Sequence, residues 1–468
     1  MSYVEIVAPE ALNKCTINLP PSKSVANRML IMAALGDVQP QTVLHRPLSE
    51  LCDDISALAL LIQTASENCK QERTSDSKQS TSDSKQSLSD SKQSPSDSKQ
   101  SPSVVDIGAA GTAMRFGTAF LSVTRGNYII TGTERIRQRP IGLLVEALRS
   151  LGADIEYVGE DGFPPLHIVG NTNLRGGQLT LKGNVSSQFI SALLMIAPTL
   201  KGGLTLTLEG DIVSRPYIDL TLALMKQFGA KACWMDERAI HIEPSELTPP
   251  ADLAIEADWT AASYWYEIEA LCNTSNIKFR EQLNHHSMQG DKVCDDIFNK
   301  IKSHTASNDS DAEQTPITSE QTLITSEQTT HDSADALQSV FCYDFTRCPD
   351  LAQTIVVTCC MLDVPFRFTG LQTLRIKETD RIEALSTELA KLGYVLQTAE
   401  STICWDGSRC TPQPNPIIDT YHDHRMAMAF APCALKLKHI CIADPDVVTK
   451  SYPTYWHDLR AAGIICRK

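Results

Sequence analysis

LVEALRSLGADIEY, residues 144–157, joins an amphipathic helical pattern to a β-rich segment and sets the fold class of this chain. The pattern recurs as LTLALMKQFGAKACW at residues 220–234 and as ALSTELAKLGYVLQT at residues 384–398. A glycine stands between the two parts of every copy, where glycine commonly ends a helix. The recurrence predicts a mixed α/β protein built from repeated units. The three glycines are Gly152, Gly229 and Gly393.

A second pattern repeats six times along the chain. In each repeat a Ser, Thr or Asp of N-cap type opens an apolar stretch of helical length, which a short turn joins to a β-rich segment. The intervals between successive openings are 88, 74, 74, 90 and 73 residues, so the series is nearly symmetric about its middle. This symmetry predicts two homologous halves of three units each. The openings are Ser24, Thr112, Ser186, Thr260, Asp350 and Asp423.

Two low-complexity tracts fall in the two long intervals. Residues 74–101 hold four copies of a heptad such as TSDSKQS without an apolar seam, which excludes a coiled coil. Residues 303–335 carry seven acidic side chains and neither lysine nor arginine. We interpret both tracts as disordered surface loops inserted at the same place in each half. The alternative is that they dock a partner.

Composition narrows the class of protein. A chain of 468 residues that is 42% hydrophobic and 21% charged can form two or three packed domains. Its formal charge of −14 disfavours nucleic-acid binding and an anionic membrane partner. No apolar run is long enough to span a bilayer and no leader is visible, so we expect a cytoplasmic protein. Fifteen cysteines without a C-x-x-C pair predict reduced thiols and no structural zinc site.

Polar and basic residues gather at the expected helix starts. Backbone N–H groups and the positive end of the helix dipole attract anions there, so several converging starts predict phosphate or carboxylate binding. Taken singly, each motif also fits a capped or solvated surface helix. The Gly-rich motif lacks the features of a P-loop or a dinucleotide fingerprint, which argues against ATP and NAD. The motifs are PSKS (21–24) with Arg28, GAAGTAMR (108–115), RIRQRP (135–140), SSQ (186–188), SRPY (214–217), RIKETDR (375–381), DHRM (423–426) and KSYP (450–453).

These motifs, in this order, resemble those of the 5-enolpyruvylshikimate-3-phosphate synthase family. The resemblance rests on PSKS with a following arginine, GTAMR, RPI, SSQ, SRPYID, PD, RIKETDR, DHRMAM and TKSYP, and it covers nearly the whole chain outside the two tracts. It implies a two-lobed inside-out α/β barrel of six βαβαββ-type units, three in each lobe. Residues 1–21 with 253–468 would form one lobe, and residues 22–252 the other.

The resemblance also implies an activity. The enzyme would transfer the enolpyruvyl group of phosphoenolpyruvate to the 5-hydroxyl of shikimate 3-phosphate and release phosphate, in the shikimate pathway to chorismate and aromatic amino acids. It would use no metal and no organic cofactor, and it would act as a monomer. Two alternatives stay open: an enolpyruvyl transferase acting on UDP-N-acetylglucosamine, and an inactive protein that binds phosphorylated ligands.

Site residues follow from the resemblance, position by position. Asp350 would accept the proton of the attacking hydroxyl, Glu378 would move protons at the enolpyruvyl methylene, and Lys23 would assist as a proton donor. The shikimate 3-phosphate site would comprise Lys23, Ser24, Arg28, Ser186, Ser187, Gln188, Ser214, Tyr217, Asp350 and Lys377. The phosphoenolpyruvate site would comprise Lys23, Gly111, Thr112, Arg139, Gln188, Arg381, Arg425 and Lys450. The sequence departs from the family pattern at Ala109 and Thr373, where many relatives carry asparagine.

Overall fold

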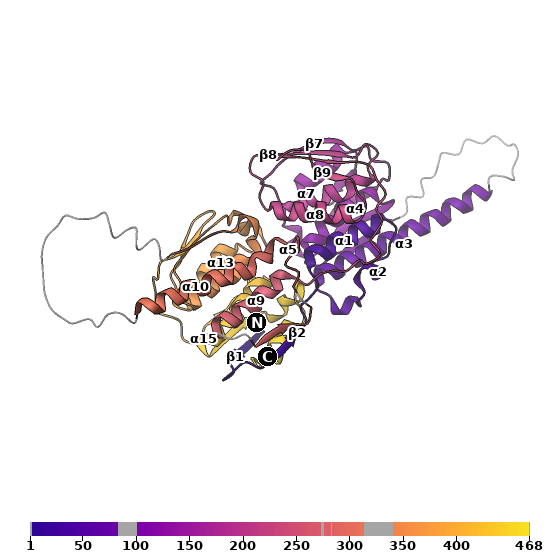
Figure 1. The fold of residues 1–468 in the computed structure, drawn as a ribbon. Helices are drawn as coiled ribbons and strands as arrows, with labels where there is room; N and C mark the ends of the chain where they lie inside the picture. The colour runs from indigo at the N-terminus through magenta and orange to yellow at the C-terminus, as the bar shows by residue number, and fades with distance from the viewer. Residues whose placement is uncertain (1, 83–100, 273–275, 282, 313–339, 468) are drawn as a thin grey trace, which may run out of the picture. The chain divides into compact units, whose positions relative to one another are not determined.

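The computed structural model describes residues 2–82, 101–272, 276–281, 283–312 and 340–467 (Figure 1). The chain divides into two units by its own internal contacts. Unit 1 consists of Met1–Pro20 with Ala257–Lys468, and unit 2 consists of Pro21–Glu256. Each unit is mixed α/β and has a hydrophobic core of its own, as the recurring helix–glycine–strand pattern predicts.

Unit 2 contains two four-stranded sheets of the same topology. In each sheet the first two strands are parallel, and the remaining pairs are antiparallel. The register places Leu206 opposite Leu179 and Ile240, so apolar side chains of neighbouring strands share the core-facing side. The first sheet has the order β3 (Ser103–Asp106), β4 (Gly126–Thr131), β6 (Leu166–Gly170), β5 (Asp154–Tyr157), and the second has the order β7 (Gly177–Lys182), β8 (Leu204–Glu209), β10 (Ala239–Ile242), β9 (Ala232–Trp234).

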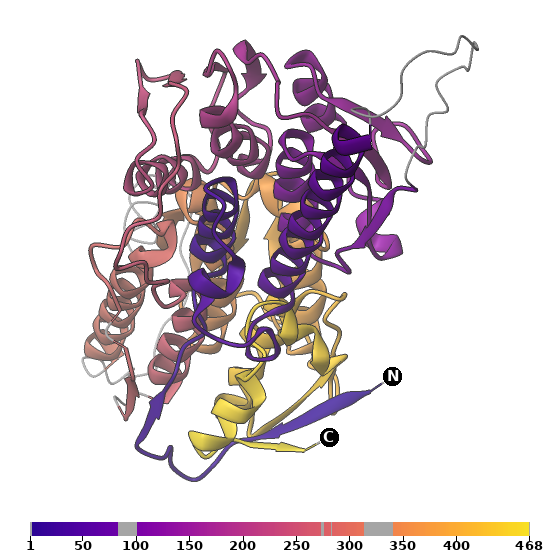
Figure 2. The same cartoon turned by 90° about the vertical axis from the view of Figure 1, so that its right-hand side faces the viewer.

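Unit 1 contains two sheets of the same topology, and one of them includes a strand from the N-terminus. In the second of its sheets, β1 (Tyr3–Val7) supplies the strand that an internal strand supplies in the other three sheets, so the two ends of the chain lie side by side (Figure 2). A further parallel pair joins β2 (Cys15–Ile17) to β11 (Ile277–Phe279). The sheets run β12 (Phe341–Asp344), β13 (Phe366–Thr369), β15 (Ile403–Trp405), β14 (Gln397–Thr398), and β16 (Ile417–Ile418), β17 (His439–Ala443), β1, β18 (Ile465–Arg467).

Helices connect the strands so that three segments of the chain have the order βαβαββ, while the last segment, from β16 to β18, has the order βαβαβ and its sheet is completed by β1. One helix of each segment is buried on all sides, while the other is amphipathic and covers the sheet. The buried helices are α4 (Gly111–Val123), α7 (Ser187–Ile196), α12 (Ala352–Met361) and α14 (His424–Phe430), and α1 (Lys23–Leu35) and α9 (Trp259–Cys272) pack against them. The amphipathic helices include α6 (Gly142–Ser150), α8 (Arg215–Gln227), α13 (Arg381–Lys391) and α16 (Tyr455–Ala461).

The predicted glycine stops are confirmed. Gly152, Gly229 and Gly393 follow the ends of α6, α8 and α13, and all three have positive φ, between 84° and 99°. A side chain with a Cβ rarely adopts this backbone conformation, which explains why glycine stands there in every copy.

The predicted N-caps are confirmed at two of the six openings. Ser186 and Asp423 cap α7 and α14 with their side chains. Ser24, Thr112 and Thr260 instead lie inside the first turn, and Asp258 caps α9 in place of Thr260. Asp350 lies in the short 3-10 helix η5 (Pro349–Leu351). The prediction was wrong there because hydroxyl and carboxylate side chains one residue inside a helix start point away from its free N–H groups.

Helical backbone continues into the start of both low-complexity tracts. Helix α3 runs over Asp53–Ser82 and α10 over Cys294–Ala312, so residues 74–82 and 303–312 are helical where the sequence predicted irregular loops. The remainder of each tract, 83–100 and 313–335, lies outside the described residues. Across the part of the chain that the structure describes, no helix is both long and apolar enough to cross a membrane.

Candidate active site

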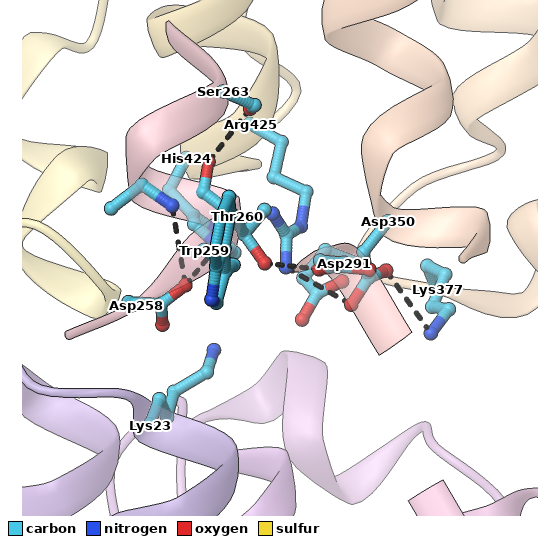
Figure 3. Close-up of polar contacts among 12 residues, drawn as sticks. Lys23, Asp258, Trp259, Thr260, Ser263, Asp291, Asp350, Lys377, His424 and Arg425 are labelled. Carbon is cyan, nitrogen blue, oxygen red and sulfur yellow. Dashed lines mark hydrogen bonds and ion pairs between the residues drawn. The ribbon is translucent and has the colours of Figure 1, made fainter. Parts of the chain in front are cut away.

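A cluster of alternating charges lies at the helix starts of unit 1. We call it the unit 1 charge cluster. Its cationic members include a buried arginine, and two of its three carboxylates, Asp350 and Glu378, form ion pairs with two or more cations each (Figure 3 shows Asp350, Lys377 and Arg425). It consists of Asp350, Lys377, Glu378, Arg381, Asp423, Arg425 and Lys450.

Asp350 is held by three cations. Its Oδ1 lies 3.0 Å from Arg381 Nη1 and 3.5 Å from Lys377 Nζ, and its Oδ2 lies 3.0 Å from Arg425 Nη2. Burial alone would raise the pKa of this carboxyl, but Arg425, Lys377 and Arg381 outweigh burial and hold the pKa well below its usual range. Asp350 is therefore ionised at neutral pH.

Lys377 and Glu378 are adjacent in the chain, and both belong to the unit 1 charge cluster. Burial lowers the pKa of Lys377, although the Asp350 carboxylate opposes that shift. Glu378 receives Arg381 Nη2 at 3.0 Å on one oxygen and Lys450 Nζ at 2.9 Å on the other.

Arg381 organises the cluster from the first residue of α13. Its side chain is 2% exposed and donates to three carboxylates. Besides Asp350 and Glu378, Arg381 pairs with Asp423 through Nε at 2.7 Å and Nη2 at 3.3 Å. Burial would lower the arginine pKa, but the carboxylates, Asp423 foremost, raise it above its ordinary value. The interpretation of RIKETDR as a solvated face is wrong for this residue.

Arg425 links the cluster to α9. Its Nη1 lies 3.5 Å from the Tyr264 hydroxyl, whose pKa burial raises to about 12. Sequence reasoning did not assign Tyr264 or Asp423 to the site. The N-cap position of Asp423 in the DHRM motif was the available signal, whereas the Tyr264 contact spans 161 residues and has no local signature.

In unit 2, Lys23 stands at the first residue of α1. Its Nζ lies 3.1 Å from Oδ2 of Asp54, a side chain that is 2% exposed. Asp54 belongs to the first turn of α3 and was not foreseen, because nothing in the sequence near residue 54 points to residue 23. The pair fixes the lysine stem at a helix start.

Arg28 lies one turn further along α1 and is buried. Its guanidinium donates to Thr221 Oγ1 at 2.7 Å, Ser191 Oγ at 3.0 Å and the Ser24 carbonyl at 2.8 Å, with a longer contact of 3.4 Å to the Tyr217 carbonyl. All of these acceptors are neutral, and burial lowers the arginine pKa to about 10. Within the described ranges, no carboxylate forms an ion pair with Arg28. No anion among the described residues therefore compensates its charge.

The Gly-rich motif lies beside two arginines, Arg115 and Arg139. A Cβ at Gly111 would lie 2.5 Å from Arg139 Nη1 and 2.8 Å from Arg115 Nη1, so a larger residue at the start of α4 would displace these guanidiniums. Gln188 Nε2 donates to Thr112 Oγ1 at 3.1 Å and ties the start of α7 to the same place.

Two further helix starts of unit 2 carry predicted residues. Ser186 caps α7, with Ser187 as its first helical residue, and Ser214 precedes α8 with φ of +58°. The Tyr217 ring centroid is 6.0 Å from Arg28 Cζ. Of the three arginines in RIRQRP, only Arg139 joins this site, since Arg135 and Arg137 are exposed.

The predicted residues thus divide between two candidate sites, one in each unit. Unit 1 holds Asp350, Lys377, Glu378, Arg381, Arg425 and Lys450, and unit 2 holds Lys23, Ser24, Arg28, Gly111, Thr112, Arg139, Ser186, Ser187, Gln188, Ser214 and Tyr217. Among the described residues, no three His, Cys, Asp or Glu side chains gather as ligands of a metal ion.

Comparison with known proteins gives these sites a family. The family model of EPSP synthase (3-phosphoshikimate 1-carboxyvinyltransferase) matches residues 7–459. A 3-phosphoshikimate 1-carboxyvinyltransferase of Bacteroides fragilis (strain YCH46) is 48% identical over 99% of this chain and 98% of its own length. The enzyme of that name from Vibrio campbellii is 32% identical over 98% and 99%.

Solved structures agree on the fold. EPSP synthase from Acinetobacter baumannii aligns with a TM-score of 0.64 at 18% identity, covering 100% of both chains. The enolpyruvyl transferase NikO from Streptomyces tendae aligns with a TM-score of 0.58 at 12% identity, covering 99% of this chain and 98% of its own. At these identities the likeness establishes the mixed α/β fold alone.

The fold, the charge-lined sites and the match along the whole chain define an enzyme of the transferase class. Within that class, the chain belongs to the EPSP synthase family, the 3-phosphoshikimate 1-carboxyvinyltransferases. The family resemblance predicted from the motifs is confirmed.

Proposed function

We propose that this enzyme transfers the enolpyruvyl group of phosphoenolpyruvate to the 5-hydroxyl of shikimate 3-phosphate, giving 5-enolpyruvylshikimate 3-phosphate and phosphate. The reaction serves the shikimate pathway to chorismate and aromatic amino acids. One observation carries the proposal: relatives with the name of this activity match 99% of the chain at 48% identity. Because both substrates are phosphorylated carboxylates, the cation-rich helix starts suit them, and neither metal nor organic cofactor takes part.

The finer architecture belongs to the same proposal. Three βαβαββ segments, and a fourth segment whose sheet is completed by β1, share one strand order, which supports six such units in a two-lobed inside-out barrel. Unit boundaries at residues 20/21 and 256/257 lie close to those expected for lobes of 1–21 with 253–468 and of 22–252. The monomeric state and the cytoplasmic location stay predictions.

Asp350 is the base for the attacking hydroxyl. Its lowered pKa keeps it ionised, so it can accept the proton as the new C–O bond forms at C2 of phosphoenolpyruvate. A proton reaches C3 from Glu378, with Lys23 assisting, and a tetrahedral intermediate results. Glu378 then takes a proton back from the methyl group while the C–O bond to phosphate breaks, which restores the enolpyruvyl double bond. The proton on Asp350 leaves with the departing phosphate.

Shikimate 3-phosphate is held mainly by unit 2 residues. Ser24 and Arg28 bind its carboxylate, because the buried guanidinium has only neutral partners among the described residues and gains most from an anion. Hydroxyls at two helix starts bind its phosphate. The full set is Lys23, Ser24, Arg28, Ser186, Ser187, Gln188, Ser214, Tyr217, Asp350 and Lys377.

Phosphoenolpyruvate takes the remaining cations. Guanidiniums pair with carboxylate and phosphate through two hydrogen bonds, which orients the ligand as well as binding it. The Arg139 guanidinium lies where a Cβ at residue 111 would be, which supports a role for this cation at the start of α4. The full set is Lys23, Gly111, Thr112, Arg139, Gln188, Arg381, Arg425 and Lys450.

An acceptor comparison tests the proposed function. Purified protein is incubated with phosphoenolpyruvate and either shikimate 3-phosphate or UDP-N-acetylglucosamine, and phosphate release is followed, with Asp350→Ala as background. We expect release that depends on shikimate 3-phosphate and is lost in the variant. Phosphate release with UDP-N-acetylglucosamine alone would show that the sugar nucleotide is the acceptor. No release with either compound would favour an inactive protein that binds phosphorylated ligands.

Arg28→Met is expected to weaken binding of shikimate 3-phosphate while it increases the stability of the ligand-free protein. The buried charge has no anionic partner among the described residues, so methionine should raise the free energy of unfolding of the ligand-free protein by about 1 kcal/mol. Affinity for shikimate 3-phosphate should fall roughly 10- to 100-fold, the range of a charge-assisted hydrogen bond. Denaturant titration and calorimetry measure the two quantities.

The matched control is Arg149→Met. Arg149 donates to the Ile155 carbonyl at 2.9 Å and lies outside both sites, so its loss should leave the affinity within about twofold. If Arg28→Met keeps full affinity, Arg28 does not bind the ligand carboxylate.

A further inference from the structure

A short loop of unit 1 is clamped to the start of α9. Gln289 is buried, and its Nε2 donates to the Ala257 carbonyl at 2.9 Å. Its Oε1 accepts from the Trp259 backbone N–H at 3.3 Å. Immediately after this clamp comes the 3-10 helix η3 (Gly290–Val293). The two hydrogen bonds fix the position of Asp291, the second residue of η3.

Asp291 is a buried carboxyl that no motif pointed to. Only 5% of the residue is exposed. Its Oδ2 accepts a hydrogen bond from the Thr260 hydroxyl. Its Oδ1 is buried and has no hydrogen-bond partner among the described residues. Figure 3 shows Asp291 beside Asp350, with Thr260 and Arg425 around it. A buried carboxyl satisfied on one side only is costly, so its position calls for a functional reason.

The groups around Asp291 make its charge sensitive to pH. Burial raises its pKa to about 7, the Asp350 carboxylate adds to the shift, and the Thr260 hydroxyl and Arg425 oppose it. The titratable and charged groups that face it are Asp350, Arg425, Asp258, Cys294 and Cys348.

We propose that Asp291 is a positioning residue of the reaction, whose carboxyl, fixed by Thr260 and the Gln289 clamp, sets the charge beside Asp350 and Arg425. The proposal rests on the function proposed above and adds a residue to its machinery. Asp291 contacts no reacting atom. It acts through Asp350, the base.

The sign of the effect follows from the neighbouring charges. Three cations hold Asp350 ionised, which also makes it a weak base. A second negative charge on Asp291 raises the proton affinity of Asp350 and strengthens the base without protonating it. The rate of the chemical step therefore rises with pH as Asp291 ionises.

A pH profile of kcat with both substrates saturating tests this. In the wild type we expect a rising limb centred near the Asp291 pKa of about 7. Asp291→Asn keeps the acceptor for Thr260 but is neutral at every pH, so the limb should disappear and kcat at about pH 8.5 should fall roughly three- to tenfold.

Thr260 variants give an independent readout. Thr260→Val removes the hydroxyl that lowers the Asp291 pKa, so the limb should move to higher pH. Thr260→Ser keeps the hydroxyl and should return the limb to its wild-type position. These shifts decide the question even if Asp291→Asn does not fold. An unchanged limb in both Asp291→Asn and Thr260→Val would overturn the proposal.

Stability supplies a readout that needs no catalysis. The folded chain keeps the Asp291 proton up to a pKa of about 7, while the unfolded chain releases it near the ordinary value of 3.8. As the pH rises from about 3.8 to about 7, the free energy of unfolding of the wild type should therefore decrease relative to that of Asp291→Asn. Parallel stability curves would contradict the proposal. A wild type without phosphate release on shikimate 3-phosphate would instead contradict the proposed function.

Discussion

Asp350→Asn is expected to lower kcat by roughly 10²- to 10⁴-fold, the usual contribution of a positioned general base. The asparagine side chain fills the same space, and its single oxygen accepts a hydrogen bond from Arg381 or from Arg425 but not from both, because these arginines donate to different oxygens of Asp350. It cannot take the proton of the substrate hydroxyl. The loss should therefore appear in the chemical step and persist at saturating concentrations of both substrates.

Steady-state kinetics on purified Asp350→Asn distinguish the loss of the general base from a defect in substrate binding. We expect the KM values to change far less than kcat, because an interaction made only as the proton moves leaves ground-state binding largely intact. Asp344→Asn is the matched control: Asp344 is an exposed N-cap six residues earlier, and asparagine caps equally well. It should stay within about twofold of the wild type. A loss below tenfold in Asp350→Asn would remove Asp350 from its role as base.

Local patterns explain why much of the fold could be predicted. Helix period, glycine stops and strand alternation are short-range properties, and Gly152, Gly229 and Gly393 end their helices as expected. The motifs RIKETDR and DHRM also predicted a cationic site. Both motifs contribute to one cluster. Arg381 is the first residue of α13, Arg425 is the second residue of α14, and both donate hydrogen bonds to Asp350.

Burial and long-range partners could not be predicted. Arg375 and Arg381 stand in one motif, yet Arg375 forms a part-exposed pair with Asp380 at 2.7 Å whereas Arg381 is buried. The sequence offers no difference between them that sets exposure. Asp54 and Asp291 were missed for a related reason, since each meets its partner through packing of helices distant in the chain.

Arg381→Met is expected to lower the free energy of unfolding by about 3–5 kcal/mol, the cost of breaking a buried ionic network from one side. Methionine fills much of the space but leaves Asp423, whose side chain is fully buried, without its two guanidinium contacts. Asp350 and Glu378 each lose a cation as well. Repulsion among three carboxylates then adds to the desolvation cost.

The contrast with other arginines makes this prediction sharp. Arg467 forms an exposed pair with Glu5 at 3.6 Å, so Arg467→Met should change stability by less than about 1 kcal/mol. Arg28→Met should stabilise the ligand-free protein, because that buried guanidinium faces neutral acceptors only among the described residues. Denaturant titrations of the three variants compare the values directly. If Arg381→Met unfolds with wild-type stability, the carboxylates of the cluster are balanced by the remaining cations, and Arg381 serves ligand binding alone.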